Sequence, residues 1–102
     1  MRSQVVGDTL RILGVTQLAA ANANAFRDWV REAFAETQKN IEIDLSETAF
    51  LDSCGLGALV ELHKTACGRA GKVRLLNPQP PVQQILELTR MNQIFEISKP
   101  QA

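Results

Sequence analysis

Short stretches of alternating apolar and polar residues recur along the chain, and this period of two predicts β-strands. In residues 41–45 (IEIDL), the three apolar side chains share one face, whereas Glu42 and Asp44 share the other. Four further stretches are predicted as strands: Val5–Val6, Thr9–Val15, Lys72–Leu76 and Ile94–Ile97. Gly7 and Asp8 separate the first two of these, which predicts a tight turn that pairs them.

Three other stretches have the apolar spacing of an amphipathic helix. The first covers about residues 22–37, and the second follows the segment DSCGLG at 52–57 and ends near Gly68 and Gly71. The third begins at Pro80, because proline is tolerated in the first turn of a helix. The order ββαβαβαβ predicts an α/β fold with a central mixed, largely parallel sheet. We expect one domain over residues 1–102, with a polar C-terminal tail over 97–102.

Composition and charge narrow the classes of function. The 102 residues contain 11 Lys and Arg against 11 Asp and Glu, so no net charge attracts the chain to nucleic acid. No apolar run approaches the length of a membrane span and no signal-peptide core is present, so we expect a cytoplasmic protein without membrane insertion. Cys54, Cys67 and the single histidine, His63, lack the spacing of a metal site. We therefore expect neither a metal nor a cofactor.

The segment DSCGLG carries the candidate chemistry, because it joins a strand to a helix at the carboxyl end of the predicted sheet. A nucleophile elbow would need a small residue two positions before Ser53, where Leu51 stands. The only histidine, His63, lies ten residues along the same helix, which is about 15 Å from Ser53. Gly55 and Gly57 match neither glycine-rich nucleotide loop. We therefore do not expect an enzyme.

Two interpretations of Ser53 remain open on spacing alone. In the first, the hydroxyl stands open beside two glycines and is phosphorylated, which adds about −1.5 to −2 charges. The helix N-terminus favours the phosphate and Asp52 opposes it, while a partner that buried a neutral serine would have to bury a dianion. In the second, Asp52 or Ser53 only caps the helix, which contributes about 1 kcal/mol.

Residues 41–97 resemble the STAS family, the domain of sulphate transporters and anti-sigma factor antagonists, and the N-terminal part is collinear with it. The shared pattern is an acidic strand end, D-S-x-G-L-G at a helix start, N-P after the next strand and a final F-x-I strand. The matching residues are Asp44, Asp52, Ser53, Gly55, Leu56, Gly57, Asn77, Pro78, Phe95 and Ile97. The resemblance is strongest to the bacterial antagonist branch.

That resemblance implies a regulatory switch. An anti-sigma factor with serine kinase activity would phosphorylate Ser53 and release the antagonist, and a serine phosphatase would reset it. The partner-binding residues would be Asp44, Asp52, Ser53, Cys54, Gly55, Leu56 and Gly57. The alternative is a non-switching STAS scaffold in a stress-sensing assembly, or an accessory subunit of a lipid ABC transporter.

Two residues depart from the family pattern. Ala19 occupies the place of an aspartate that the family often carries near the phosphorylation site, and Cys54 replaces a common serine or threonine. The first departure implies that one acidic contact to the kinase is missing. A weak homodimer is a further candidate arrangement.

Overall fold

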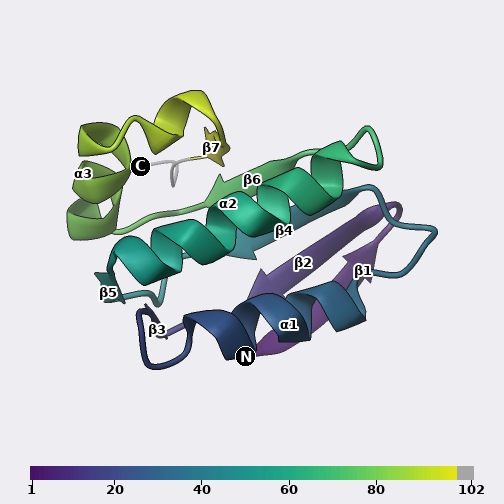
Figure 1. Cartoon of the computed structure of the whole chain (residues 1–102), viewed down its shortest axis with the longest axis horizontal. Helices are drawn as coiled ribbons and strands as arrows, with labels where there is room; N and C mark the ends of the chain where they lie inside the picture. Colours follow the sequence, from purple (N-terminus) through teal and green to yellow (C-terminus); the bar gives the residue numbers. More distant parts are fainter. Residues whose placement is uncertain (99–102) are drawn as a thin grey trace.

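Five strands form the central sheet in the computed structural model, which describes residues 1–98. They are β1 (Arg2–Val6), β2 (Thr9–Leu13), β4 (Asn40–Asp44), β6 (Val73–Leu76) and β7 (Glu96–Ser98). Their spatial order is β1-β2-β4-β6-β7, and only the β1–β2 pair is antiparallel. The predicted α/β fold with a mixed, largely parallel sheet is therefore confirmed (Figure 1).

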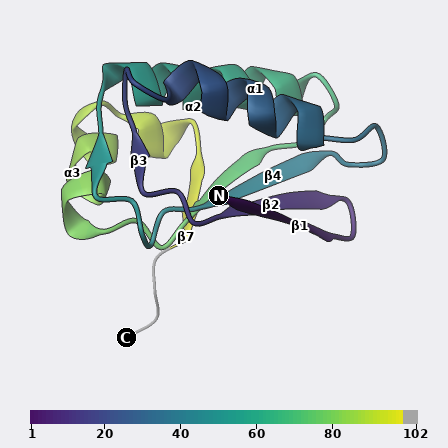
Figure 2. The ribbon, with the colours of Figure 1, turned by 90° about the horizontal axis from the view of Figure 1, so that it is seen from below.

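Three α-helices connect the parallel strands. They are α1 (Ala23–Ala33), α2 (Ser53–Cys67) and α3 (Pro80–Leu88), and a short 3-10 helix, η1 (Met91–Gln93), follows the last of them. Helices α1 and α2 lie side by side over one face of the sheet, and α3 stands beside its end (Figure 2). The predicted order ββαβαβαβ is confirmed for the main sheet and its helices.

The core lies between the sheet and helices α1 and α2. Each interior strand alternates, so that one set of aliphatic side chains points toward α1 and α2. The fully buried side chains of the core include Leu10, Ile12, Ile41, Ile43, Leu75, Phe26, Val30, Leu59 and Leu62. Because every second residue of these strands contributes an aliphatic side chain to this core, the hydrophobic pattern fixes the sheet register.

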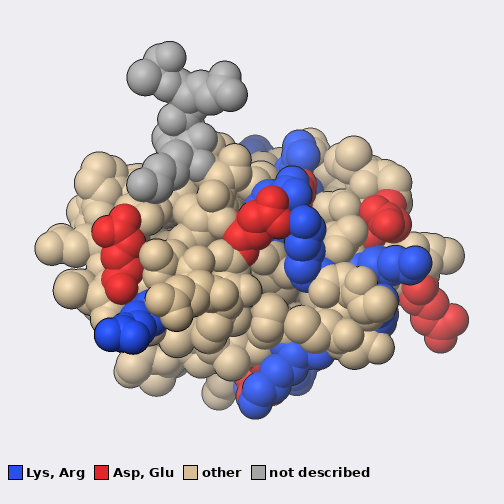
Figure 3. All heavy atoms as spheres, turned by 90° about the horizontal axis from the view of Figure 1, so that it is seen from above, with Lys and Arg blue, Asp and Glu red and all other residues tan. Residues whose placement is uncertain are grey.

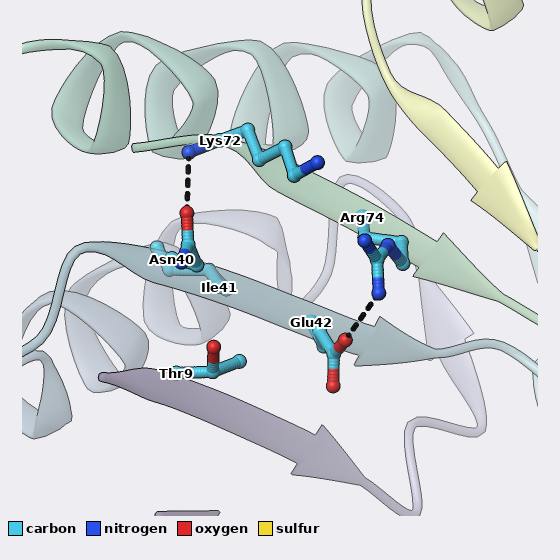
Figure 4. A pocket seen from close by; sticks show the side chains of 6 residues that line it. All are labelled: Thr9, Asn40, Ile41, Glu42, Lys72 and Arg74. Carbon is cyan, nitrogen blue, oxygen red and sulfur yellow. Dashed lines mark hydrogen bonds and ion pairs between the residues drawn. The ribbon is translucent and has the colours of Figure 1, made fainter. Parts of the chain in front are cut away.

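The opposite face of the sheet carries a row of ion pairs instead of helices. Glu42 on β4 contacts Arg11 at 2.9 Å and Arg74 at 3.0 Å. Arg74 and Lys72 both contact Glu96 on β7, at 3.0 Å and 2.6 Å. Figure 4 shows Glu42 and Arg74 pointing toward each other across β4 and β6. Cross-strand pairing of opposite charges stabilises this face of the sheet.

Two further strands, which the sequence does not predict, form a separate parallel pair. They are β3 (Gln17–Leu18) and β5 (Phe50–Leu51). The buried hydroxyl of Thr48 donates to the Val15 carbonyl at 2.6 Å and joins the same two segments. Two-residue strands are too short to show a period, so only the tertiary structure reveals them. Their pairing places the chain around residue 18 against the start of α2.

Element boundaries differ from the predictions at several places. Strand β2 ends at Leu13 instead of Val15, and β6 begins at Val73 instead of Lys72. The first strand begins at Arg2 instead of Val5, and α1 ends at Ala33 because Phe34 leaves the helical conformation at φ −82°, ψ 86°. The last strand is shifted to Glu96–Ser98, because Ile94 and Phe95 still bond back to the Met91 carbonyl. Residues 97 and 98 of the predicted tail thus belong to β7, and 99–102 lie outside the described residues. None of the helices described in 1–98 is long and apolar enough to cross a membrane.

Candidate functional site

Helix α2 begins at Ser53, beside the carboxyl ends of the parallel strands (Figure 1). Asp52 is the N-cap residue, with an extended backbone at φ −117°, ψ −172°, and its carbonyl accepts the first helical bond from the Leu56 N–H at 2.9 Å. The position that the sequence predicts for the DSCGLG segment is therefore confirmed.

Asp52 is tied to two segments of the chain at once. One carboxylate oxygen accepts from the Gly55 N–H at 3.0 Å, and the other accepts from the Ala20 N–H at 3.1 Å. Its own N–H donates to the Leu18 carbonyl at 3.1 Å. The bond from Gly55, with a further contribution from Ala20, lowers the pKa of Asp52 below its ordinary value. The capping interpretation is thus confirmed for Asp52, whose charge is held by backbone N–H groups.

The Ser53 side chain, unlike that of Asp52, does not cap the helix. Its side chain is exposed on the first turn of α2, and within residues 1–98 its hydroxyl makes no hydrogen bond to the protein. Cys54 is also exposed, and Leu56 is half-buried against the core. A hydroxyl at this position is accessible to another protein, and the partial positive charge of the helix N-terminus lies next to it.

The two glycines of the segment have different surroundings. Gly55 is buried, and a Cβ atom there would stand 2.1 Å from the Leu18 carbonyl oxygen. Gly57 is exposed, and a Cβ atom there would meet nothing within 4 Å. The expectation that both glycines keep the approach to Ser53 open therefore fits Gly57 only. Gly55 instead allows α2 to pack closely on the β3 segment.

Asp44 lies apart from this segment. It ends β4 and is half-buried, and its carboxylate accepts from the Ser46 N–H at 3.0 Å. In the described part of the chain, no hydrogen bond or ion pair joins it to residues 52–57. The structure therefore brings together the site residues from Asp52 to Gly57 and leaves Asp44 apart from them, at the end of β4.

Ala19 lies in the loop that contacts Asp52. Its side chain is 8% exposed, its N–H donates to the Asn22 side chain at 2.9 Å, and the next residue, Ala20, donates to Asp52. The departure from the family pattern is therefore adjacent to the candidate site. Phe50, which the sequence does not single out, is 55% exposed only three residues before Ser53. Its neighbour Leu51 is buried, and because both residues are apolar, no polarity pattern in the sequence shows which of them is exposed.

Catalytic and metal-binding groups do not gather around Ser53. His63 packs edge-to-face on Phe95, with ring centroids 5.6 Å apart, and the His63 ring is ten residues along α2 from Ser53. Among residues 1–98, no three metal-ligating side chains cluster. A pocket at the amino ends of the strands is lined by Thr9, Asn40, Ile41, Glu42, Lys72 and Arg74 (Figure 4). The carboxylate and cations that line it are already ion-paired within the row on the sheet.

Surface charge does not favour one sign of partner. Figure 3 shows basic and acidic side chains interspersed on one face of the molecule. This agrees with the equal numbers of acidic and basic residues in the chain. A uniform electrostatic attraction to the phosphates of nucleic acid requires a basic surface, which this face lacks.

Relatives with known names resemble the chain over most of its length. A protein of Thermotoga maritima named "Putative anti-sigma factor antagonist" is 30% identical over 95 residues, which cover 92% of this chain and 84% of that protein. A STAS-domain containing protein of Pseudomonas aeruginosa is 37% identical over 73 residues, which cover 72% of this chain and 71% of that protein.

Solved structures agree with the fold. The crystal structure of a putative anti-sigma factor antagonist from Thermotoga maritima matches with a TM-score of 0.85 at 25% identity, over 97% of this chain and 86% of that chain. The anti-sigma factor antagonist SpoIIAA, in its unphosphorylated form, matches with a TM-score of 0.76 at 20% identity, over 96% of this chain and 87% of that chain. The family model described as "STAS domain" matches residues 4–100. The chain therefore belongs to the STAS domain family.

Proposed function

We propose that this protein is an anti-sigma factor antagonist that is switched by phosphorylation of Ser53. In its unphosphorylated form it binds an anti-sigma factor through the start of α2, and it thereby frees a sigma factor. The observation that carries the proposal is that Asp52 and Ser53 have different roles at this helix start. Asp52 caps the helix, while the exposed Ser53 hydroxyl bonds to no group in residues 1–98.

Because Ser53 does not cap the helix, its phosphorylation changes the surface charge without unfolding the domain. A phosphate on Ser53 replaces no intramolecular hydrogen bond of the hydroxyl, and the helix N-terminus stabilises its negative charge. A bound partner would instead have to desolvate about two extra charges, which costs several kcal/mol when they are unpaired. The Asp52 carboxylate, whose pKa is lowered by the Gly55 and Ala20 N–H groups, adds a further negative charge beside the phosphate. Phosphorylation therefore ends binding.

The proposed partners follow from this chemistry. The anti-sigma factor carries the serine kinase activity that modifies Ser53, and a serine phosphatase restores the hydroxyl. Direct contact with nucleic acid is not part of the mechanism, because the chain has no net positive charge. The protein itself acts as a regulatory binding protein instead of an enzyme, and the exchange takes place in the cytoplasm, where sigma factors act. Contacts to the partner come from Asp52, Ser53, Cys54, Leu56 and Gly57, with Gly55 beneath them and Asp44 at the end of β4.

A non-switching scaffold is the second candidate function. The observation in its favour is Ala19, whose buried methyl group lies beside the Asp52 contact in the place of the family's aspartate. Without that acidic side chain, a kinase has one contact fewer near Ser53. In this second case, the same surface would bind a multi-domain assembly or a transporter permanently.

Phosphorylation with a matched control separates the two candidates. The protein is incubated with ATP and the anti-sigma kinase encoded in the same genome, and its intact mass is measured. We expect a mass gain of one phosphate group in the wild-type protein and in Ser46→Ala, and no gain in Ser53→Ala. Ser46→Ala is the matched control, because Ser46 is an exposed serine in the preceding loop. If the wild-type protein gains no phosphate from any cognate kinase, the switch is wrong and the scaffold is favoured.

A further inference from the structure

Strand β1 is an unprotected edge of the central sheet. It is the first strand in the order β1-β2-β4-β6-β7, and all five of its residues are exposed. Val5 and Val6 are 61% and 52% exposed, and the strand contains neither proline nor lysine. The opposite edge strand, β7, has three described residues and carries the ion-paired Glu96. Because soluble proteins usually blunt such edges, an undefended strand of this length indicates a pairing surface.

The backbone groups that point away from the sheet can be assigned from the hairpin register. The two-residue turn between β1 and β2 closes on the pair Val6 and Thr9. Hydrogen-bonded pairs alternate along an antiparallel ladder, so every second residue of β1 directs its N–H and C=O groups to β2. The residues whose N–H and C=O groups point outward are Ser3 and Val5. They offer two donors and two acceptors at the free edge.

We propose that β1 pairs antiparallel with β1 of a second copy of this chain, with the twofold axis at Gln4. In this register Ser3 stands opposite the partner's Val5, and Val5 stands opposite the partner's Ser3. All four outward donors and acceptors on each strand are then used, and the two five-stranded sheets become continuous. An antiparallel edge is self-complementary about a twofold axis, which is the usual symmetry of a homodimer.

Charge complementarity favours a second copy as the occupant. The only charged residue of β1 is Arg2, and the turn at the other end of the strand carries Asp8. In the proposed register Arg2 lies opposite the partner's Val6 and diagonal to the partner's Asp8, within reach of a long side chain. The twofold axis generates this pair twice. The same pairing covers Val5 and Val6, which a monomer exposes to water.

The proposed dimer leaves the candidate switch site free. Strand β1 is at the edge of the sheet, whereas α2 connects the interior strands β4 and β6. A dimer therefore presents two Ser53 sites, and the test of pairing is independent of the test of phosphorylation.

Disulfide trapping tests the register directly. In a chain with Cys54→Ala and Cys67→Ala, we introduce Gln4→Cys or, as the matched control, Ser3→Cys. Two residues 4 form a non-hydrogen-bonded pair about 4.5 Å apart at Cα, which a disulfide can bridge. Two residues 3 are diagonal neighbours, more than about 7 Å apart, which a disulfide does not span. We expect Gln4→Cys to form covalent dimers at least tenfold faster than Ser3→Cys on mild oxidation.

Sedimentation velocity over a concentration series tests the association itself. We expect the wild-type chain to dimerise reversibly, and Val5→Lys to weaken the association constant at least tenfold. Leu88→Lys is the control, because Leu88 is 76% exposed on α3 and lies outside the proposed interface. Circular dichroism checks that each variant is folded. A wild-type chain that stays monomeric up to about 1 mM, or equal trapping of the two cysteine variants, overturns the proposal.

Discussion

We expect replacement of Gly55 by alanine to destabilise the protein, whereas replacement of Gly57 by alanine should stabilise it. At Gly55, the new Cβ atom would lie 2.1 Å from the Leu18 carbonyl oxygen and 2.8 Å from the Leu18 Cβ atom. An ordinary contact begins near 3.4 Å, so α2 and Leu18 must separate by more than an ångström. Leu18 is fully buried and its carbonyl accepts the Asp52 N–H, so this movement disturbs both the packing and the hydrogen bond.

The magnitude follows from three contributions. Overpacking in a close contact costs about 1–3 kcal/mol, and weakening one backbone hydrogen bond costs about 1 kcal/mol. The helix propensity of alanine over glycine returns about 1 kcal/mol. Gly55→Ala is therefore expected to lower the free energy of unfolding by about 2 kcal/mol. Gly57→Ala meets nothing within 4 Å, so only the propensity gain remains and stability rises by about 0.5–1 kcal/mol.

Urea unfolding followed by far-ultraviolet circular dichroism measures both variants. We expect equal m-values and midpoints that shift in opposite directions, because neither change alters the surface exposed on unfolding by much. In thermal unfolding, the two variants should differ by about 10 °C or more. A difference between their unfolding free energies below about 0.5 kcal/mol would refute the conclusion that Gly55 permits the close approach of α2 to Leu18.

The remaining predictions concern other contacts. The Arg69 guanidinium donates to the backbone carbonyls of Phe34, Ala35 and Gln38 and lies 3.9 Å from the Phe34 ring centroid, so Arg69→Ala should lower the unfolding free energy by about 2 kcal/mol. In the same urea assay, an unchanged midpoint in Arg69→Ala would contradict this role. The pKa of Asp52 and that of Glu96 are lowered in the folded protein. Each carboxylate therefore stabilises the folded protein fully at pH values above its ordinary pKa, and this stabilisation is lost as the pH falls through its lowered pKa. Urea midpoints measured between pH 7 and 2 should therefore fall at the acid end, and less steeply in Asp52→Asn; an identical acid slope in that variant would contradict the prediction.

The sequence alone predicts the main architecture because the interior strands and helices are strongly periodic. Ile41, Ile43 and Leu45 alternate with polar residues, and all three are fully buried in the core, the first two on β4 and Leu45 directly after it. The partners of Glu42 could not be predicted, since Arg11 and Arg74 come from strands that only the fold brings beside it.

The candidate site was predictable in position but not in its internal contacts. The segment from Asp52 to Gly57 starts a helix, as its residue types indicate. The bond from Ala20 to Asp52 spans 32 positions and depends on the pairing of β3 with β5, two strands too short for any sequence pattern. The close approach to Leu18 that requires Gly55 arises from the same pairing. The sequence therefore predicts one role for both glycines, whereas in the structure Gly57 leaves the approach to Ser53 open and Gly55 permits close packing of α2.

In the proposed switch, a phosphate on Ser53 ends binding to the anti-sigma factor. Isothermal titration calorimetry of the purified anti-sigma factor with the unmodified and the fully phosphorylated protein tests it most directly. We predict binding of the unmodified form and an affinity at least a hundredfold lower for the phosphorylated form, which corresponds to about 2.7 kcal/mol. Equal affinities of the two forms, with both shown to be folded, would rule out the proposed switch.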